Sequence, residues 1–165
     1  MPRERPELSD EQRSRLATAC LENVGDALVL AEDLMKRGSV PPAAFFVWVA
    51  WQEMLKSLYC VSAGAISWKA WWTGYRSHED KIAVAHALTS ASEGFENIMG
   101  QFRDATIYVE VGDDGEPLRP RDLVGEDGLD TEGLHRWITQ IRSSSRLILT
   151  SLSDAKPLPR IGETA

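Results

Sequence analysis

Arg76, His78 and Lys81 lie close together in the stretch YRSHEDK, residues 75–81, directly after a tryptophan-rich segment. A metal-independent ribonuclease needs a base that works near neutral pH and cations that stabilise the charge developing on the phosphate. Histidine titrates in that pH range, so His78 is the candidate base and Arg76 or Lys81 the candidate cation. The stretch therefore predicts a catalytic or phosphate-binding site. The solvated start of a helix would contain the same residue types, and this second interpretation stays open.

Glu53 and Lys56 form a second candidate pair, because they interrupt the longest apolar stretch of the chain, residues 41–65. An unpaired charge in such a helix is costly. At a spacing of three residues the two side chains can pair with each other on one helix face. Alternatively, they face a polar pocket that YRSHEDK completes from the start of the next long helix, where a helix N-terminus favours an anion. Glu53 and Lys56 are therefore predicted binding residues.

Motifs for other site chemistries are absent. The sequence contains no HExxH, GxxxxGK[ST], GxGxxG or GxSxG, and its acidic runs GDDGEP and GEDGLDTE do not match the calcium-loop spacing. Cys20 and Cys60 have no CxxC partner and lie in apolar helical surroundings, which indicates buried thiols in a reducing compartment. We predict no metal site and no cofactor.

Length and charge favour one acidic cytoplasmic domain. The chain has 165 residues and a formal charge of −7, so any contact with RNA must be local. Its N-terminus is charged and lacks the apolar run of a secretory signal, and Glu53 and Lys56 argue against a membrane span. We predict a single domain over residues 8–153 and a flexible, proline-marked tail over 154–165.

Local signals predict two long antiparallel helices in the first part of the chain. Ser9 and Gln12 have capping-box spacing, and Gly38 supplies a stop after about Arg37. Two prolines then open a second helix that runs to about residue 63. The predicted apolar stripe of the first helix is Leu16, Cys20, Val24, Ala27, Ala31 and Leu34.

The tryptophan-rich segment predicts a short helix or tight turn that ends near Gly74. Ser77 and Asp80 then resemble an N-cap that opens a third long helix. Trp48 and Trp51 are predicted core residues on the second helix. The three tryptophans of the short segment are assigned either to the core or to a surface that covers a partner: Trp68, Trp71 and Trp72.

The remaining sequence predicts an extended arm or hairpin near residues 106–119, because strand formers there flank the turn sequence GDDGEP. Asp130 or Thr131 caps a last helix that ends near Ser153. Its predicted buried face is Leu134, Ile138, Ile141, Ser145, Ile148 and Leu152. The fold class is therefore predicted to be all-α, an antiparallel helical bundle with a small arm.

Four segments in order resemble the AbiV family of abortive infection proteins. The family pattern is a helix "N-A-x-x-L-L-x-x-A-x-x-L", then "EE-x-x-K", then an aromatic stretch running into "H-x-x-K", then a "YV-D" arm. These elements fall on residues 23–34, 53–56, 78–81 and 108–109. The sequence departs from the pattern at a few positions, which are Val24, Ala27, Gln52 and Glu110.

The resemblance implies a HEPN-like helical domain that defends bacteria against phage. Such a protein would arrest the infected cell by interfering with RNA or translation after a phage protein trigger. Active HEPN ribonucleases carry an arginine and a histidine several residues apart, whereas Arg76 and His78 are separated by one residue and Lys81 with His86 is the nearest formal match. A ribonuclease therefore stays an open interpretation. The alternatives are a non-catalytic protein-interaction module and a small-ligand sensor of the same fold.

HEPN-like domains commonly pair through helices, so the resemblance also implies a homodimer. The three closely spaced tryptophans supply apolar surface for such pairing.

Overall fold

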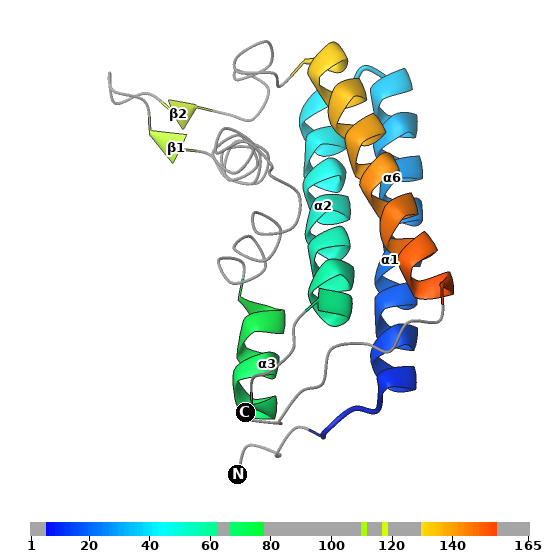
Figure 1. Ribbon diagram of the computed structural model, residues 1–165. Coiled ribbons are helices and arrows are strands. Elements are labelled where there is room, and N and C mark those ends of the chain that lie inside the picture. The colour runs from blue at the N-terminus through cyan, green and yellow to red at the C-terminus, as the bar shows by residue number, and fades with distance from the viewer. Residues whose placement is uncertain (1–5, 63–66, 78–109, 112–116, 119–129, 155–165) are drawn as a thin grey trace. The chain divides into compact units, whose positions relative to one another are not determined.

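The computed structural model describes residues 6–62, 67–77, 110–111, 117–118 and 130–154 (Figure 1). Within these residues the chain is an all-α helical bundle with one small hairpin, as predicted. The elements are α1 (Asp10–Lys36), α2 (Val40–Ser62), α3 (Trp68–Arg76), β1 (Glu110–Val111), β2 (Pro117–Leu118) and α6 (Thr131–Ser153).

The predicted capping signals fix both ends of α1. Ser9 N–H donates to Gln12 Oε1 over 2.8 Å, and Gln12 N–H donates to Ser9 Oγ over 3.2 Å, which is the reciprocal capping box. At the other end Gly38 adopts a φ of 73°, a left-handed conformation that glycine adopts without steric cost. Ser39 N–H then reaches back to Leu34 O over 2.9 Å. The chain reverses within three residues, so α2 runs antiparallel to α1.

The chain divides into two compact units, and α1, α2 and α6 each contribute to both. Of the described residues, the unit that we call the α3 unit contains α1 up to Glu22, α2 from Gln52, all of α3, and α6 from Ser144. The unit that we call the β unit contains the remaining parts of these three helices together with β1 and β2. A single domain over residues 8–153 stays a prediction.

The core of the α3 unit forms around Trp71, which is completely buried against Ala17, Tyr59 and Cys60. Trp71 stacks on Tyr75 with ring centroids 5.4 Å apart, and its ring lies 5.9 Å from that of Tyr59. Trp68 and Trp72 are partly buried against the same cluster. The tryptophans thus pack inside the unit, so the partner-covering interpretation is wrong for Trp71. Trp71 therefore supplies no apolar surface for the predicted homodimer, which stays a prediction.

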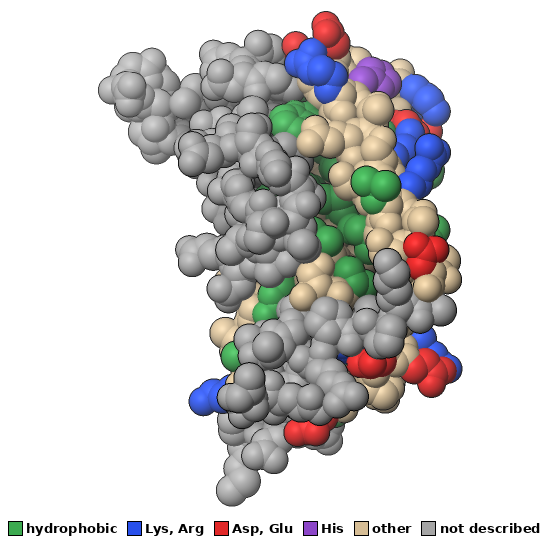
Figure 2. All heavy atoms as spheres, viewed as in Figure 1, with side chains coloured by type: hydrophobic (Ala, Val, Ile, Leu, Met, Phe, Trp, Pro, Cys, Tyr) green, Lys and Arg blue, Asp and Glu red, His purple; other side chains and the backbone are tan. Residues whose placement is uncertain are grey.

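In the β unit, α6 packs by the face that its sequence period predicts. Leu134, Ile138 and Ile141 are buried, and Gly133 N–H donates to Asp130 Oδ1 over 2.6 Å, so Asp130 caps the helix. β1 and β2 pair antiparallel, with Glu110 opposite Leu118, inside the predicted arm. Figure 2 shows acidic, basic and histidine side chains gathered over the first turns of α6.

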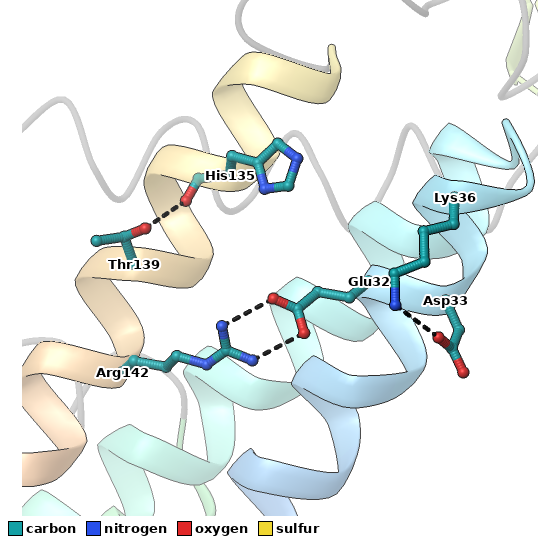
Figure 3. Close-up of polar contacts among 6 residues, drawn as sticks. All are labelled: Glu32, Asp33, Lys36, His135, Thr139 and Arg142. Carbon is teal, nitrogen blue, oxygen red and sulfur yellow. Dashed lines mark hydrogen bonds and ion pairs between the residues drawn. The ribbon is translucent and has the colours of Figure 1, made fainter.

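Glu32 of α1 and Arg142 of α6 form a two-pronged ion pair in the β unit (Figure 3). Arg142 Nη1 and Nη2 donate to Glu32 Oε1 and Oε2 over 2.7 and 2.9 Å. The hydrogen bonds from Arg142 lower the pKa of the Glu32 carboxyl, and its partial burial opposes this effect. The pair is part-exposed, so its contribution to stability is modest, roughly 0.5–1 kcal/mol.

Because the pKa of Glu32 is lower in the folded than in the unfolded chain, this contribution is present at neutral pH and is lost as the pH falls through the folded value. Glu32→Gln is therefore expected to lower the free energy of unfolding by roughly 0.5–1 kcal/mol at neutral pH and by much less in acid. Urea denaturation of the parent and the variant at pH 7 and at about pH 3 measures this. An equal difference at both pH values would contradict the prediction.

In the described ranges, no helix is both long enough and apolar enough to cross a membrane.

Candidate functional site

Glu53 and Lys56 form an ion pair along α2, as their spacing predicts. Lys56 Nζ donates to Glu53 Oε1. The Lys56 side chain is 30% exposed and the Glu53 side chain is 15% exposed. The flanking residues Met54 and Leu55 are buried. The pair therefore stands at the edge of the α3 unit's interior, with the Lys56 side chain more exposed than that of Glu53.

Cys20 of α1 and Tyr75 of α3 complete this site. The Cys20 sulfur lies 3.5 Å from Tyr75 Oη, within hydrogen-bonding distance. Burial raises the pKa of Cys20, the hydrogen bond with Tyr75 opposes this, and the charge of Glu53 raises the pKa further. Cys20, Glu53, Lys56 and Tyr75 therefore form one polar group on three helices, which we call the Glu53 cluster.

The sequence analysis missed Cys20 and Tyr75 as members of this site. Cys20 was assigned only to the apolar stripe of the first helix, where it is indeed buried with a free thiol. Cys20 and Lys56 lie the same number of residues from Gly38, so an antiparallel pair of helices places them at the same level. Tyr75 follows Trp71 by four residues and therefore shares its helix face. These two signals were present in the sequence.

Burial determines which members of the cluster carry charge. It is the main cause of the raised pKa of Tyr75, and the hydrogen bond with Cys20 adds to it. Burial likewise raises the pKa values of Cys20 and Cys60. These groups stay protonated near neutral pH and are poor nucleophiles or bases there. The charged groups of the cluster are Glu53 and Lys56, which suits it for binding a polar partner.

Arg13 is a buried cation that the sequence analysis did not identify. Its side chain is 1% exposed, and Nη2 pairs with Asp10 Oδ1 over 3.0 Å while Nη1 donates to the Cys60 carbonyl over 3.4 Å. This guanidinium group links the first turn of α1 to α2 within the α3 unit. A structural role explains its burial, since the carboxylate and the carbonyl both accept from it.

Arg76 does not lie at the start of a helix. It is exposed in the last turn of α3, which continues two residues beyond the predicted end at Gly74. The start of the next long helix, where Arg76 was predicted to act beside the open amides, lies outside the described residues, so that role stays a prediction. The carbonyl end of a helix carries partial negative charge, so the position favours a cation for structural reasons.

Ser77 is the C-cap of α3, and its N–H donates to the carbonyls of Thr73 and Gly74. Its predicted role as the N-cap of a third long helix depends on Asp80, which lies outside the described residues. His78, Lys81 and His86 lie outside them as well. Their approach to Glu53 and Lys56 stays a prediction.

In the part of the chain that the structure describes, no group of three or more His, Cys, Asp or Glu side chains is arranged to hold a metal ion. Comparison of the chain with protein-family models, with curated proteins and with solved structures found no match in any of the three.

Proposed function

We propose that this chain is an antiphage defence protein of the abortive infection type. It acts in the cytoplasm as a homodimer, responds to a phage protein and arrests the infected cell by interfering with RNA or translation. The support is the ordered resemblance to AbiV, in which "EE-x-x-K" falls on residues 53–56. The observation that carries the proposal is the part-buried Glu53–Lys56 ion pair at the edge of the α3 unit.

Stability alone is a weak reason to keep this pair. Two charges lose hydration when they are partly buried, and replacing such a pair by apolar residues is often neutral or stabilising. The Lys56 side chain stays part-exposed, and Glu53, the less exposed of the two, holds its ammonium group through the ion pair. An ammonium group that is held in place in this way suits recognition of an anionic group, such as an RNA phosphate or an acidic protein segment.

Lys56→Met is expected to weaken phage protection by roughly tenfold or more, because loss of one charged contact typically weakens binding by that factor. Protection is measured as efficiency of plating on bacteria that express the chain, and cell survival after saturating infection shows whether protection works by arrest. Lys36→Met is the matched control, because Lys36 pairs with Asp33 at the same spacing but is 75% exposed. It is expected to protect as well as the parent.

Thermal denaturation of both variants separates function from folding. Lys56→Met leaves the part-buried Glu53 without its ion-pair partner and is therefore expected to lower the melting temperature. The double variant Glu53→Gln, Lys56→Met leaves no unpaired charge and is expected to keep nearly the parent's melting temperature while losing protection. Full protection by Lys56→Met, or failure of the parent to protect against any phage of a broad panel, would overturn the proposal.

A non-catalytic interaction module is the second candidate, and the part-exposed Glu53–Lys56 ion pair, which suits binding of a polar partner, favours it. Cleavage by this chain would depend on His78 with Arg76 or Lys81. Incubation of the purified protein with total RNA, with and without divalent metal, distinguishes the two. Cleavage that disappears in His78→Ala supports a ribonuclease, whereas intact RNA together with phage protection supports action by binding.

A further inference from the structure

The last turns of α6 carry an exposed face in the α3 unit that has the properties of a helix-pairing surface. The face, which we call the Thr150 face, consists of Arg146, Leu147, Thr150, Ser153 and Asp154, all of which are exposed. Leu147 is 70% exposed, the highest value among the exposed large apolar side chains of the described residues.

The hydroxyl groups of this face are already satisfied within the helix. Thr150 Oγ1 donates to the Arg146 carbonyl and Ser153 Oγ to the Leu149 carbonyl, each over 3.0 Å. Burying a hydroxyl is costly when it loses its hydrogen bond, and here that bond is kept. Thr150 and Ser153 therefore present small side chains whose hydroxyl groups need no further partner, and a second helix can approach them closely.

The residues are arranged symmetrically about Thr150. At about 100° per residue, Arg146 and Asp154 lie roughly 40° to either side of Thr150, and Leu147 and Ser153 roughly 60° to either side. Asp154 keeps the helical hydrogen bond to Thr150 O over 3.1 Å, so this geometry extends to it. In an antiparallel pair of identical helices centred on Thr150, Arg146 lies level with Asp154 of the second copy. Leu147 lies level with the second copy's Ser153, but on the opposite edge of the interface.

We propose that the Thr150 face pairs with the same face of a second copy of this chain, antiparallel, with Thr150 at the two-fold axis. The occupant is a second copy because the face is complementary to itself in charge. At the interaxial distance of packed helices, about 8–10 Å, each Arg146 reaches the opposite Asp154, which gives two equivalent ion pairs. This proposal deepens the homodimer proposed above by naming its surface.

The other exposed apolar pair lacks this complementarity. Val29 and Leu30 of α1, in the β unit, are flanked along the helix by Asp26 on one side and Asp33 on the other. An antiparallel pair that sets Val29 level with Leu30 of a second copy also sets Asp26 level with Asp33, which brings like charges together. Self-pairing is therefore favoured at α6.

The Thr150 face covers only about two helical turns, which is less than the surface of a standard stable interface. Pairing is therefore expected in the micromolar range and is best followed by sedimentation velocity over a concentration series. Arg146→Asp and Asp154→Arg are each expected to raise the dimer dissociation constant by roughly tenfold or more, because each sets like charges opposite one another.

An equimolar mixture of these two variants is the decisive sample. The heterodimer again has opposite charges at both positions, so the mixture is expected to recover pairing close to that of the parent. A parent that stays monomeric up to about millimolar concentration, or a mixture that pairs no better than either variant alone, would overturn the proposal.

Thr150→Cys supplies a second measurement that does not depend on affinity. Mild oxidation is expected to produce a covalent dimer through the two cysteines at the axis, while Cys20 and Cys60 are buried and do not compete. Thr139→Cys is the control, because Thr139 is also exposed on α6 and also bonds to the carbonyl four residues back, but lies far from the axis. Equal cross-linking of both variants would contradict the proposal. Phage protection is not a readout here, so the pairing and the defence function can fail separately.

Discussion

Trp71→Ala is expected to lower the free energy of unfolding by about 3–5 kcal/mol, the range for removing a buried tryptophan from a core. Trp71 is completely buried, and its ring contacts those of Tyr59, Trp68, Trp72 and Tyr75. The substitution removes these contacts and leaves a cavity where α3 meets α2. Urea denaturation followed by circular dichroism measures the change.

Two controls show that the effect comes from the buried ring. Trp68→Ala changes a partly buried ring at the edge of the same cluster and is expected to cost less than half as much. Trp71→Phe keeps an aromatic ring in the core. It removes the Trp71 Nε1–H, which has no hydrogen-bond acceptor among the described residues. Trp71→Phe is therefore expected to lower the free energy of unfolding by less than Trp71→Ala does. Equal losses in Trp68→Ala and Trp71→Ala would show that Trp71 is not the centre of the core.

Gly74→Ala is expected to destabilise the protein by about 1–3 kcal/mol through overpacking. A Cβ atom at residue 74 would lie 2.7 Å from Tyr59 Cζ and closer still to the Tyr59 hydroxyl oxygen. Tyr59 is buried, so its ring must shift to make room or α3 must move away from α2. The same denaturation measurement quantifies this loss.

Gly25→Ala is the matched control, because Gly25 is also a glycine within a helix but nothing lies within 4 Å of its added Cβ. Alanine has the higher helix propensity, so Gly25→Ala is expected to stabilise the protein by about 0.5–1 kcal/mol. The two substitutions are therefore expected to have opposite signs. A Gly74→Ala variant as stable as Gly25→Ala would show that the close contact with Tyr59 does not constrain α3.

The sequence by itself determined the features that depend on neighbouring residues. The bounds of α1 follow from the capping box at Ser9 and the left-handed turn at Gly38. The buried face of α6 follows from its apolar period, which brings Leu134, Ile138 and Ile141 to one side. The Glu53–Lys56 pair follows from its spacing of three residues. Each of these features is set within a few turns of one helix, where sequence spacing fixes geometry.

The tertiary structure decided everything that depends on contacts between helices. The short helix was predicted to end near Gly74, yet α3 continues to Arg76. At Gly74 the side chain of Tyr59 approaches so closely that an added Cβ would clash with it. Arg76 lies at the end of this helix and not at the start of one. The composition of the Glu53 cluster was likewise decided by packing, since Cys20 and Tyr75 are separated by 55 residues and meet only where α1 and α3 come together. Sequence spacing cannot fix such a meeting, because it depends on how apolar faces of separate helices pack to exclude water.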